Sequence, residues 1–114
     1  MSRMYEAVAG DGWAVRVVDL EGAADKGAFM DRFAAALQLP GWFGRNWDAL
    51  ADVLSDPGVW PKSATAGLVV VVTGWADFGG RRSVEWETAR EVFEEAVERR
   101  RDGDTALVVL LGLR

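Results

Sequence analysis

Apolar residues follow two different periods along the chain, and their alternation predicts an α/β fold. Three runs rich in β-branched residues, at 13–20, 68–73 and 106–111, are typical of β-strands. The second run is continuously apolar, as expected for a strand covered on both faces within a parallel sheet. Between these runs, apolar residues recur at every third or fourth position, which is the spacing of an amphipathic helix.

Two predicted helices lie between the first and second strands, and each follows a suitable capping residue. Asp25 is the expected N-cap of the first helix, which the Pro-Gly pair at 40–41 ends. Asn46 is the expected N-cap of the second helix, which the Pro-Gly pair at 57–58 ends. Their predicted inward positions are Phe29, Phe33, Ala36 and Leu37, then Trp47, Leu50, Val53 and Leu54.

The clearest helical pattern begins at Ser83, with acidic residues near its start and arginines near its end, as the helix dipole favours. Residues 79–82, Gly-Gly-Arg-Arg, are interpreted as a turn before it, because they lack the glycine spacing of a phosphate-binding loop. Its predicted inward positions are Val84, Ala89, Val92, Phe93, Ala96 and Val97.

The resulting order β, α, α, β, α, β predicts a mainly parallel sheet with right-handed crossovers, packed with helices. Residues 5–9 are expected to add an N-terminal β-hairpin by pairing with the first strand across a turn at 10–12. No repeat or long linker divides the chain, so residues 1–114 are expected to form a single domain. Trp75 and Trp86 are expected in its core.

The composition is that of a globular protein, since half of the residues are apolar and six are tryptophan. Cysteine is absent, which excludes disulfides and thiolate metal sites. No stretch approaches the roughly 20 apolar residues that span a membrane, and residues 1–12 lack the pattern of a secretory signal. A cytoplasmic location is therefore expected.

Charge and missing residue types narrow the function. The formal net charge is -5, which disfavours nucleic acid and anionic membranes as direct partners and favours a basic macromolecule. Histidine is absent, which removes the commonest general base, the usual nucleophilic systems and most zinc sites. We therefore expect neither an enzyme nor a cofactor or metal site.

The second helix is expected to expose an acidic face. Asp48 and Asp52 lie about 40° apart on a helical wheel and nearly opposite the apolar side, and Asp56 extends the row. Residues 46–61 contain no Lys or Arg to neutralise them. This face can be an ordinary solvated surface, or it can bind a basic partner.

Two aromatic residues, Trp42 and Phe43, stand between Gly41 and Gly44 in the loop before this helix. Phe43 is expected to pack inward. Trp42 is either a lid on the core or an exposed anchor for a binding partner. A ladder of glutamates on the last helix includes Glu91 and Glu95, and the residue pattern does not choose between them as members of the acidic surface.

The run at 39–54, Leu-Pro-Gly-Trp-Phe-Gly-Arg-Asn-Trp-Asp-Ala-Leu-Ala-Asp-Val-Leu, closely resembles the signature of the barstar family of ribonuclease inhibitors. Weaker similarity extends over about residues 13–112, including Trp75 and the Val-Phe-Glu-Glu-Ala segment at 92–96. The resemblance implies a barstar-like α/β fold with three parallel strands packed with helices. It also implies a protein that plugs the active site of a nuclease.

The resemblance assigns roles to individual residues. Asp52 would enter the site that normally holds the substrate phosphate, and Asp48 would pair with basic residues nearby. Trp42 would stack against catalytic residues of the nuclease, and Glu95 would add a peripheral charge contact. Hydrogen bonds would come from Gly44 and Asn46. The chain departs from the resemblance at Ala51, where the best-known member of the family has a bulky contact residue.

The expected function is therefore intracellular inhibition of a small microbial ribonuclease, with one inhibitor bound over each active site and an acidic helix that mimics RNA phosphate. The expected partner is a basic microbial ribonuclease or the nuclease domain of a toxin, and the free chain is expected to be a monomer. The alternative is an acidic docking or immunity module for another basic protein.

Overall fold

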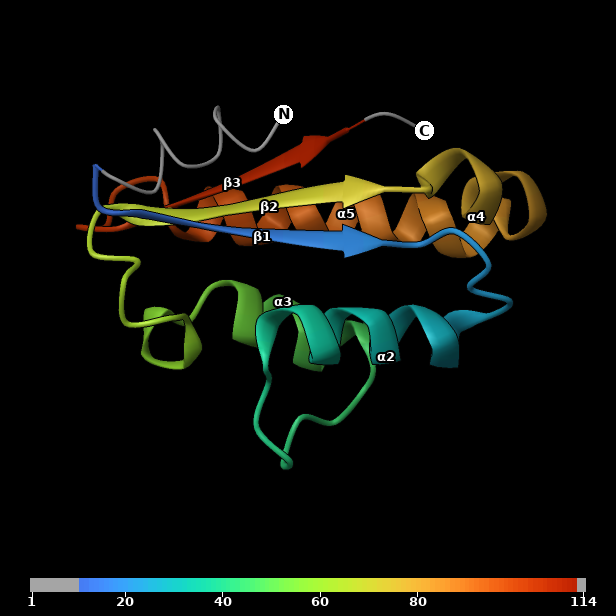
Figure 1. Cartoon of the computed structure of the whole chain (residues 1–114), viewed down its shortest axis with the longest axis horizontal. Helices are drawn as coiled ribbons and strands as arrows, with labels where there is room; N and C mark the ends of the chain where they lie inside the picture. Colours follow the sequence, from blue (N-terminus) through green and yellow to red (C-terminus); the bar gives the residue numbers. More distant parts are fainter. Residues whose placement is uncertain (1–10, 113–114) are drawn as a thin grey trace.

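The structure is a computed structural model that describes residues 11–112. Three strands, β1 (Trp13–Asp19), β2 (Gly67–Thr73) and β3 (Ala106–Leu111), form a parallel sheet in the order β1-β2-β3 (Figure 1). The predicted parallel sheet is confirmed. The hairpin predicted for residues 5–9 lies outside the described residues.

The three predicted helices are present as α2 (Lys26–Leu37), α3 (Trp47–Leu54) and α5 (Ser83–Arg99). Asp25 caps α2 as expected, because its side chain accepts a hydrogen bond from the backbone N–H of Ala28 at 2.9 Å. Two further elements were not predicted from the sequence. They are the short 3₁₀ helix η1 (Pro57–Val59) and the helix α4 (Trp75–Arg81).

The turn predicted at residues 79–82 is wrong, since Gly79 and Gly80 lie inside α4. A Cβ atom added to Gly79 would come within 2.9 Å of Cδ1 of Trp86. Glycine at position 79 therefore allows close packing between α4 and α5 and does not form a turn. Because glycine has a low helix propensity, the sequence did not predict α4.

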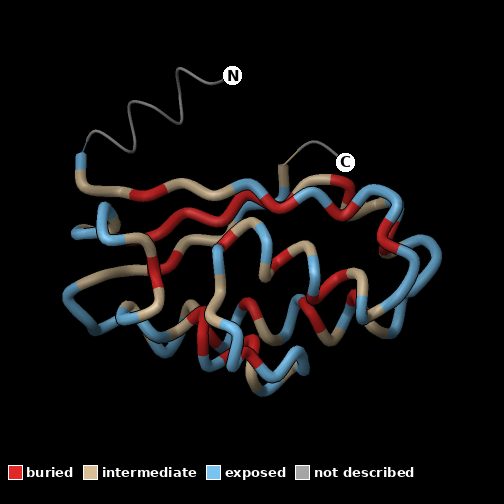
Figure 2. Tube along the Cα trace, turned by 60° about the horizontal axis from the view of Figure 1, so that its bottom comes forward, coloured by how far each residue is buried: buried red, intermediate tan, exposed pale blue. Residues whose placement is uncertain are grey.

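The helices share one hydrophobic core with one face of the sheet. Alternate residues of β2, namely Leu68, Val70 and Val72, belong to this core, and the intervening Val69 and Val71 are buried as well. The core also contains a chain of aromatic rings from α2, α4 and α5, in which Phe29 lies 4.8 Å from Phe33 between ring centroids. Figure 2 shows the buried positions along the strands and the inner sides of the helices.

Two expectations for side-chain burial need correction. Val84 is 78% exposed, because nine residues at about 100° each place it opposite the buried Phe93 on α5. Trp86 is buried as predicted, whereas Trp75 is only half-buried. Trp75 stacks on Trp86 at 6.2 Å, and its Nε1 donates a hydrogen bond to the carbonyl of Gly112 at 2.9 Å.

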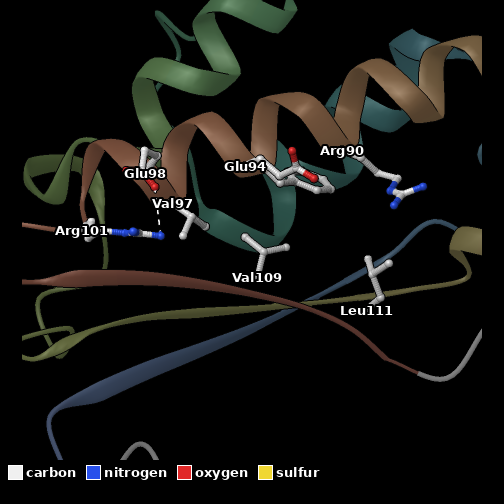
Figure 3. A pocket seen from close by; sticks show the side chains of 8 residues that line it. Arg90, Glu94, Val97, Glu98, Arg101, Val109 and Leu111 are labelled. Carbon is white, nitrogen blue, oxygen red and sulfur yellow. Dashed lines mark ion pairs between the residues drawn. The ribbon is translucent and has the colours of Figure 1, made fainter.

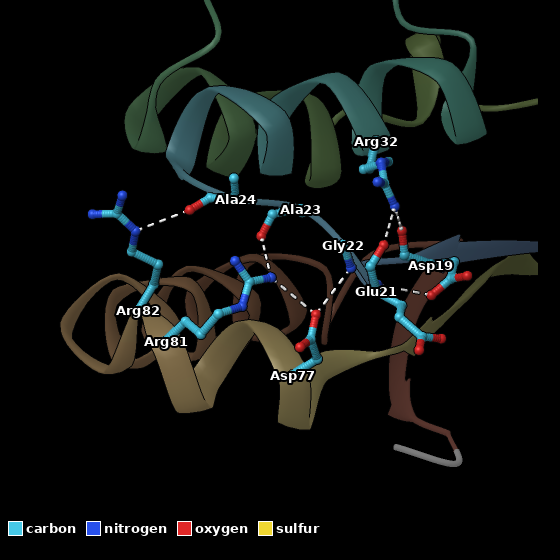
Figure 4. A network of polar contacts seen from close by, with 9 residues as sticks. All are labelled: Asp19, Glu21, Gly22, Ala23, Ala24, Arg32, Asp77, Arg81 and Arg82. Carbon is cyan, nitrogen blue, oxygen red and sulfur yellow. Dashed lines mark hydrogen bonds and ion pairs between the residues drawn. The ribbon is translucent and has the colours of Figure 1, made fainter.

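A polar network joins the β1–α2 loop to α4 (Figure 4). The carboxylate of Asp77 accepts hydrogen bonds from the side chain of Arg81 and from the backbone N–H of Gly22, both at 2.9 Å. These two donors hold the pKa of Asp77 below its ordinary value, with Arg81 the larger cause. Arg81 and Arg82 also donate to the carbonyls of Ala23 and Ala24, so both guanidiniums bind the protein's own backbone.

Within residues 11–112, no helix combines the length and the apolar character needed to cross a membrane.

Candidate functional site

The loop between α2 and α3 projects from the helices on the side away from the sheet (Figure 1). The backbone N–H of Phe43 donates to the carbonyl of Pro40 at 3.0 Å, which closes a turn. The two neighbouring aromatic side chains of this turn differ in burial. Phe43 is 6% exposed and packs on the core as predicted, whereas Trp42 is 67% exposed. Trp42 is therefore not a lid on the core.

The rest of the loop is fixed by Arg45 and Asn46. Asn46 accepts a hydrogen bond at Oδ1 from the backbone N–H of Ala49 at 2.8 Å, which makes it the predicted N-cap of α3. Its Nδ2 donates to the carbonyl of Gly44 at 3.4 Å. Arg45 pairs with Asp31 of α2. Gly44 and Asn46 are exposed, and both help to set where α3 begins.

The outward face of α3 carries the two aspartates singled out by sequence. Asp48 and Asp52 are both exposed, while Leu50 and Val53 of the same helix are buried. Asp48 lies in the first turn, where a negative charge interacts favourably with the helix dipole. Asp56 does not simply extend the row, because its Oδ1 accepts a hydrogen bond from the backbone N–H of Gly58 and caps η1.

Asp52 has an internal cationic partner, so the expectation of an acidic face without one is wrong at this position. Oδ1 of Asp52 lies 3.2 Å from Nη1 of Arg99, and Oε2 of Glu95 lies 2.9 Å from Nη2 of the same guanidinium. Arg99 was predicted only as a helix-terminal charge. Packing of α3 against α5 brings it to Asp52, and no local pattern in the sequence carries that information.

The same contacts bring Glu95 and Asp52 into one group, whereas the sequence alone did not choose between Glu95 and Glu91. The side chains of Asp52, Glu95 and Arg99 remain 74%, 55% and 45% exposed. Asp48 has no ion-pair partner within the described part of the chain. We call Asp48, Asp52, Glu95 and Arg99 the acidic surface. Three carboxylates against one guanidinium leave it with a formal charge of about −2 at neutral pH.

Ala51 points away from this surface. It is 3% exposed, and its carbonyl accepts a hydrogen bond from the hydroxyl of Ser55 at 2.6 Å. Position 51 therefore offers no side chain to a partner. The exposed aromatic group near α3 is instead Trp42 in the preceding loop.

A groove of about 390 Å³ lies between α5 and β3 (Figure 3). Val97 and Val109 line it together with Glu98 and Arg101, which form an ion pair of 3.1 Å. None of the four residues of the acidic surface lines this groove. Among residues 11–112, no three His, Cys, Asp or Glu side chains are grouped so that they could hold a metal ion.

A family model described as Barstar (barnase inhibitor) matches residues 13–112, which includes all of the strands and helices described above. No match was found among curated proteins.

Proposed function

The chain belongs to the barstar family, and we propose that it inhibits a ribonuclease of the barnase type by binding over its active site. Family membership supports the class of partner. The observation that carries the proposed binding mode is the combination of an exposed Trp42 with exposed carboxylates of Asp48 and Asp52 on a capped helix. We propose that Gly44, Asn46 and Glu95 complete the contact surface.

Phosphate mimicry is the proposed mechanism. A ribonuclease that holds the RNA backbone must present fixed cationic groups, and carboxylates can accept charge-assisted hydrogen bonds from those groups. Asp52 is proposed to enter the phosphate position, with Asp48 and Glu95 meeting basic groups around it. Because α3 is capped at Asn46 and packs against α5, the helices that carry these carboxylates are already held in place before a partner binds.

Trp42 is proposed to supply the apolar part of the contact. A side chain that is 67% exposed has a large area to bury against a partner, and tryptophan is enriched among residues that dominate binding energy. Inhibition would then require no chemistry by this chain, because occupying the active site excludes RNA.

The direct test is titration of ribonuclease activity. Barnase and other small basic microbial ribonucleases are mixed with increasing amounts of the chain, and RNA cleavage is followed. We expect activity to fall linearly to zero at one chain per enzyme for at least one of them. If every enzyme keeps full activity and none binds in calorimetry, the proposed function is wrong and a docking role toward another basic protein takes its place.

A further inference from the structure

We propose that Arg99 is a positioning residue for inhibition, which holds the carboxylates of Asp52 and Glu95 side by side and leaves one oxygen of each for the partner. This inference rests on the proposed function, because the partner's cations are those of a ribonuclease. It adds a basic residue to a surface that the sequence identifies only by its acids.

The two contacts use different nitrogen atoms of one guanidinium. Nη1 of Arg99 donates to Oδ1 of Asp52 at 3.2 Å, and Nη2 donates to Oε2 of Glu95 at 2.9 Å. A planar guanidinium presents its donors at fixed relative positions, so it fixes the two carboxylates relative to each other. Within the described residues, no hydrogen bond or ion pair is made by Oδ2 of Asp52 or Oε1 of Glu95. Those two oxygens are available to incoming cations.

A neutral contact anchors Arg99 independently of the acids. Nη1 also donates to Oγ of Ser55 at 3.3 Å, while the Ser55 hydroxyl donates its own hydrogen to the carbonyl of Ala51 at 2.6 Å. Since the hydroxyl hydrogen is used in that way, the oxygen of Ser55 is left to accept from Arg99. Arg99 can therefore stay in place when a partner binds the carboxylates. A residue that only competed with the partner's cations for these carboxylates would instead have to be displaced.

Removal of Arg99 is expected to change the two rate constants in ways that act on the affinity in opposite directions. The acidic surface loses a positive charge, so association with a basic enzyme should be as fast or slightly faster. Two carboxylate side chains lose their shared anchor and must be ordered during binding, so dissociation should be faster. We expect the second effect to dominate, with the dissociation constant of Arg99→Ala higher by about fivefold to tenfold.

The test measures association and dissociation rates for the full chain and barnase, or for the tightest binder of the ribonuclease panel. Arg99→Ala should dissociate about tenfold faster, with association not slowed. Arg99→Lys keeps the charge but has a single nitrogen, so it should associate like the parent and dissociate at an intermediate rate. Arg101→Ala is the matched control, since Arg101 follows directly after α5 and pairs with Glu98 of that helix, and this variant should match the parent in dissociation.

Two further measurements separate positioning from general loss of structure. In an Asp52→Ala, Glu95→Ala background, Arg99→Ala should no longer speed dissociation, because the groups it positions are gone. Without any partner, NMR coupling constants should show a dominant χ1 rotamer for Asp52 in the parent and averaging in Arg99→Ala.

Each outcome has a separate meaning. If the parent binds and Arg99→Ala dissociates no faster than Arg101→Ala, or binds more tightly, the positioning role is overturned and the proposed function stands. The positioning role is also overturned if Asp52 has the same χ1 rotamer populations in Arg99→Ala as in the parent. If the parent binds no ribonuclease of the panel, the proposed function itself is overturned.

Discussion

Asp52 on α3 and Arg99 on α5 form an ion pair with 3.2 Å between Oδ1 and Nη1, although 47 residues separate them in the chain. The contact joins the outward faces of two helices that pack against each other. Both side chains are exposed to solvent, and exposed pairs typically stabilise a fold by no more than about 1 kcal/mol. The proposed importance of this pair therefore lies in where it places a carboxylate rather than in folding stability.

The first prediction concerns Asp52. Asp52→Ala should weaken binding to the target ribonuclease by more than about 2 kcal/mol, as expected for a central residue of an interface. The melting temperature should change little, since only an exposed ion pair is lost. Calorimetric titration gives the affinity, and thermal unfolding gives the stability.

Glu98→Ala is the matched control for Asp52→Ala. It also removes an exposed carboxylate paired with an arginine, but Glu98 lines the groove between α5 and β3. The affinity of Glu98→Ala for the ribonuclease should stay close to that of the parent. Equal losses in the two variants would mean that net charge, and not the position of Asp52, controls binding.

Local sequence signals predicted most of the fold. Asp25 and Asn46 cap their helices as expected, and the continuous apolar run at 68–73 is a strand buried along most of its length. Helix α4 was missed because Gly79 and Gly80 lower helix propensity. What permits the helix there is close packing on Trp86, which is a tertiary contact.

The acidic surface was only partly predictable from the sequence, because part of it also depends on tertiary contacts. The spacing of Asp48 and Asp52 correctly predicted a shared exposed face, because both lie on one short helix. The link from Asp52 through Arg99 to Glu95 depends on how α3 and α5 pack, which helical periodicity does not specify. The choice of Glu95 over Glu91 for this link needed the structure.

The second prediction contrasts the two aromatic residues of the loop. Trp42→Ala should weaken ribonuclease binding by at least about 2 kcal/mol and change stability by no more than about 0.5 kcal/mol, because the side chain is 67% exposed. Phe43→Ala should instead lower the free energy of unfolding by about 3 kcal/mol, because a buried ring leaves a cavity. Denaturant unfolding and calorimetry distinguish the two. A stability loss in Trp42→Ala as large as that in Phe43→Ala would contradict this assignment.

The third prediction concerns the start of α3. Asn46→Ala should lower the free energy of unfolding by about 1 kcal/mol, since the backbone N–H of Ala49 loses its acceptor. Asn46→Asp should retain most of the stability, because aspartate is an equally good N-cap. Denaturant midpoints measure both variants. If Asn46→Ala and the parent unfold at the same denaturant concentration, the cap does not hold this helix.

The fourth prediction concerns pH and the contacts of Asp77. The donors Arg81 and Gly22 hold the pKa of Asp77 below its ordinary value, so the folded state binds a proton less readily than the unfolded state. This stabilisation is complete above the pKa of an unfolded aspartate, about 4, and is lost as the pH falls through the lower pKa of the folded state. Asp77→Asn should therefore melt below the parent at about pH 7, and the gap should narrow toward about pH 2.

Glu21→Gln is the control for Asp77→Asn, because it removes an exposed carboxylate of the adjoining loop whose oxygens accept no hydrogen bond from the described residues. Its melting temperature should follow that of the parent across the pH range. A gap for Asp77→Asn that is the same at about pH 7 and about pH 2 would show that the charge of Asp77 is not what stabilises the loop.

The last prediction concerns the rate of encounter with the enzyme. The formal net charge is -5, and the acidic surface concentrates part of this negative charge despite Arg99. Attraction between this chain and a basic ribonuclease acts over the Debye length, which shrinks from about 30 Å at 0.01 M salt to about 8 Å at 0.15 M. The association rate constant should therefore fall at least tenfold between these conditions, while the dissociation rate changes much less. Stopped-flow mixing measures the first rate and displacement the second, and an association rate that is insensitive to salt would mean that charge does not guide the encounter.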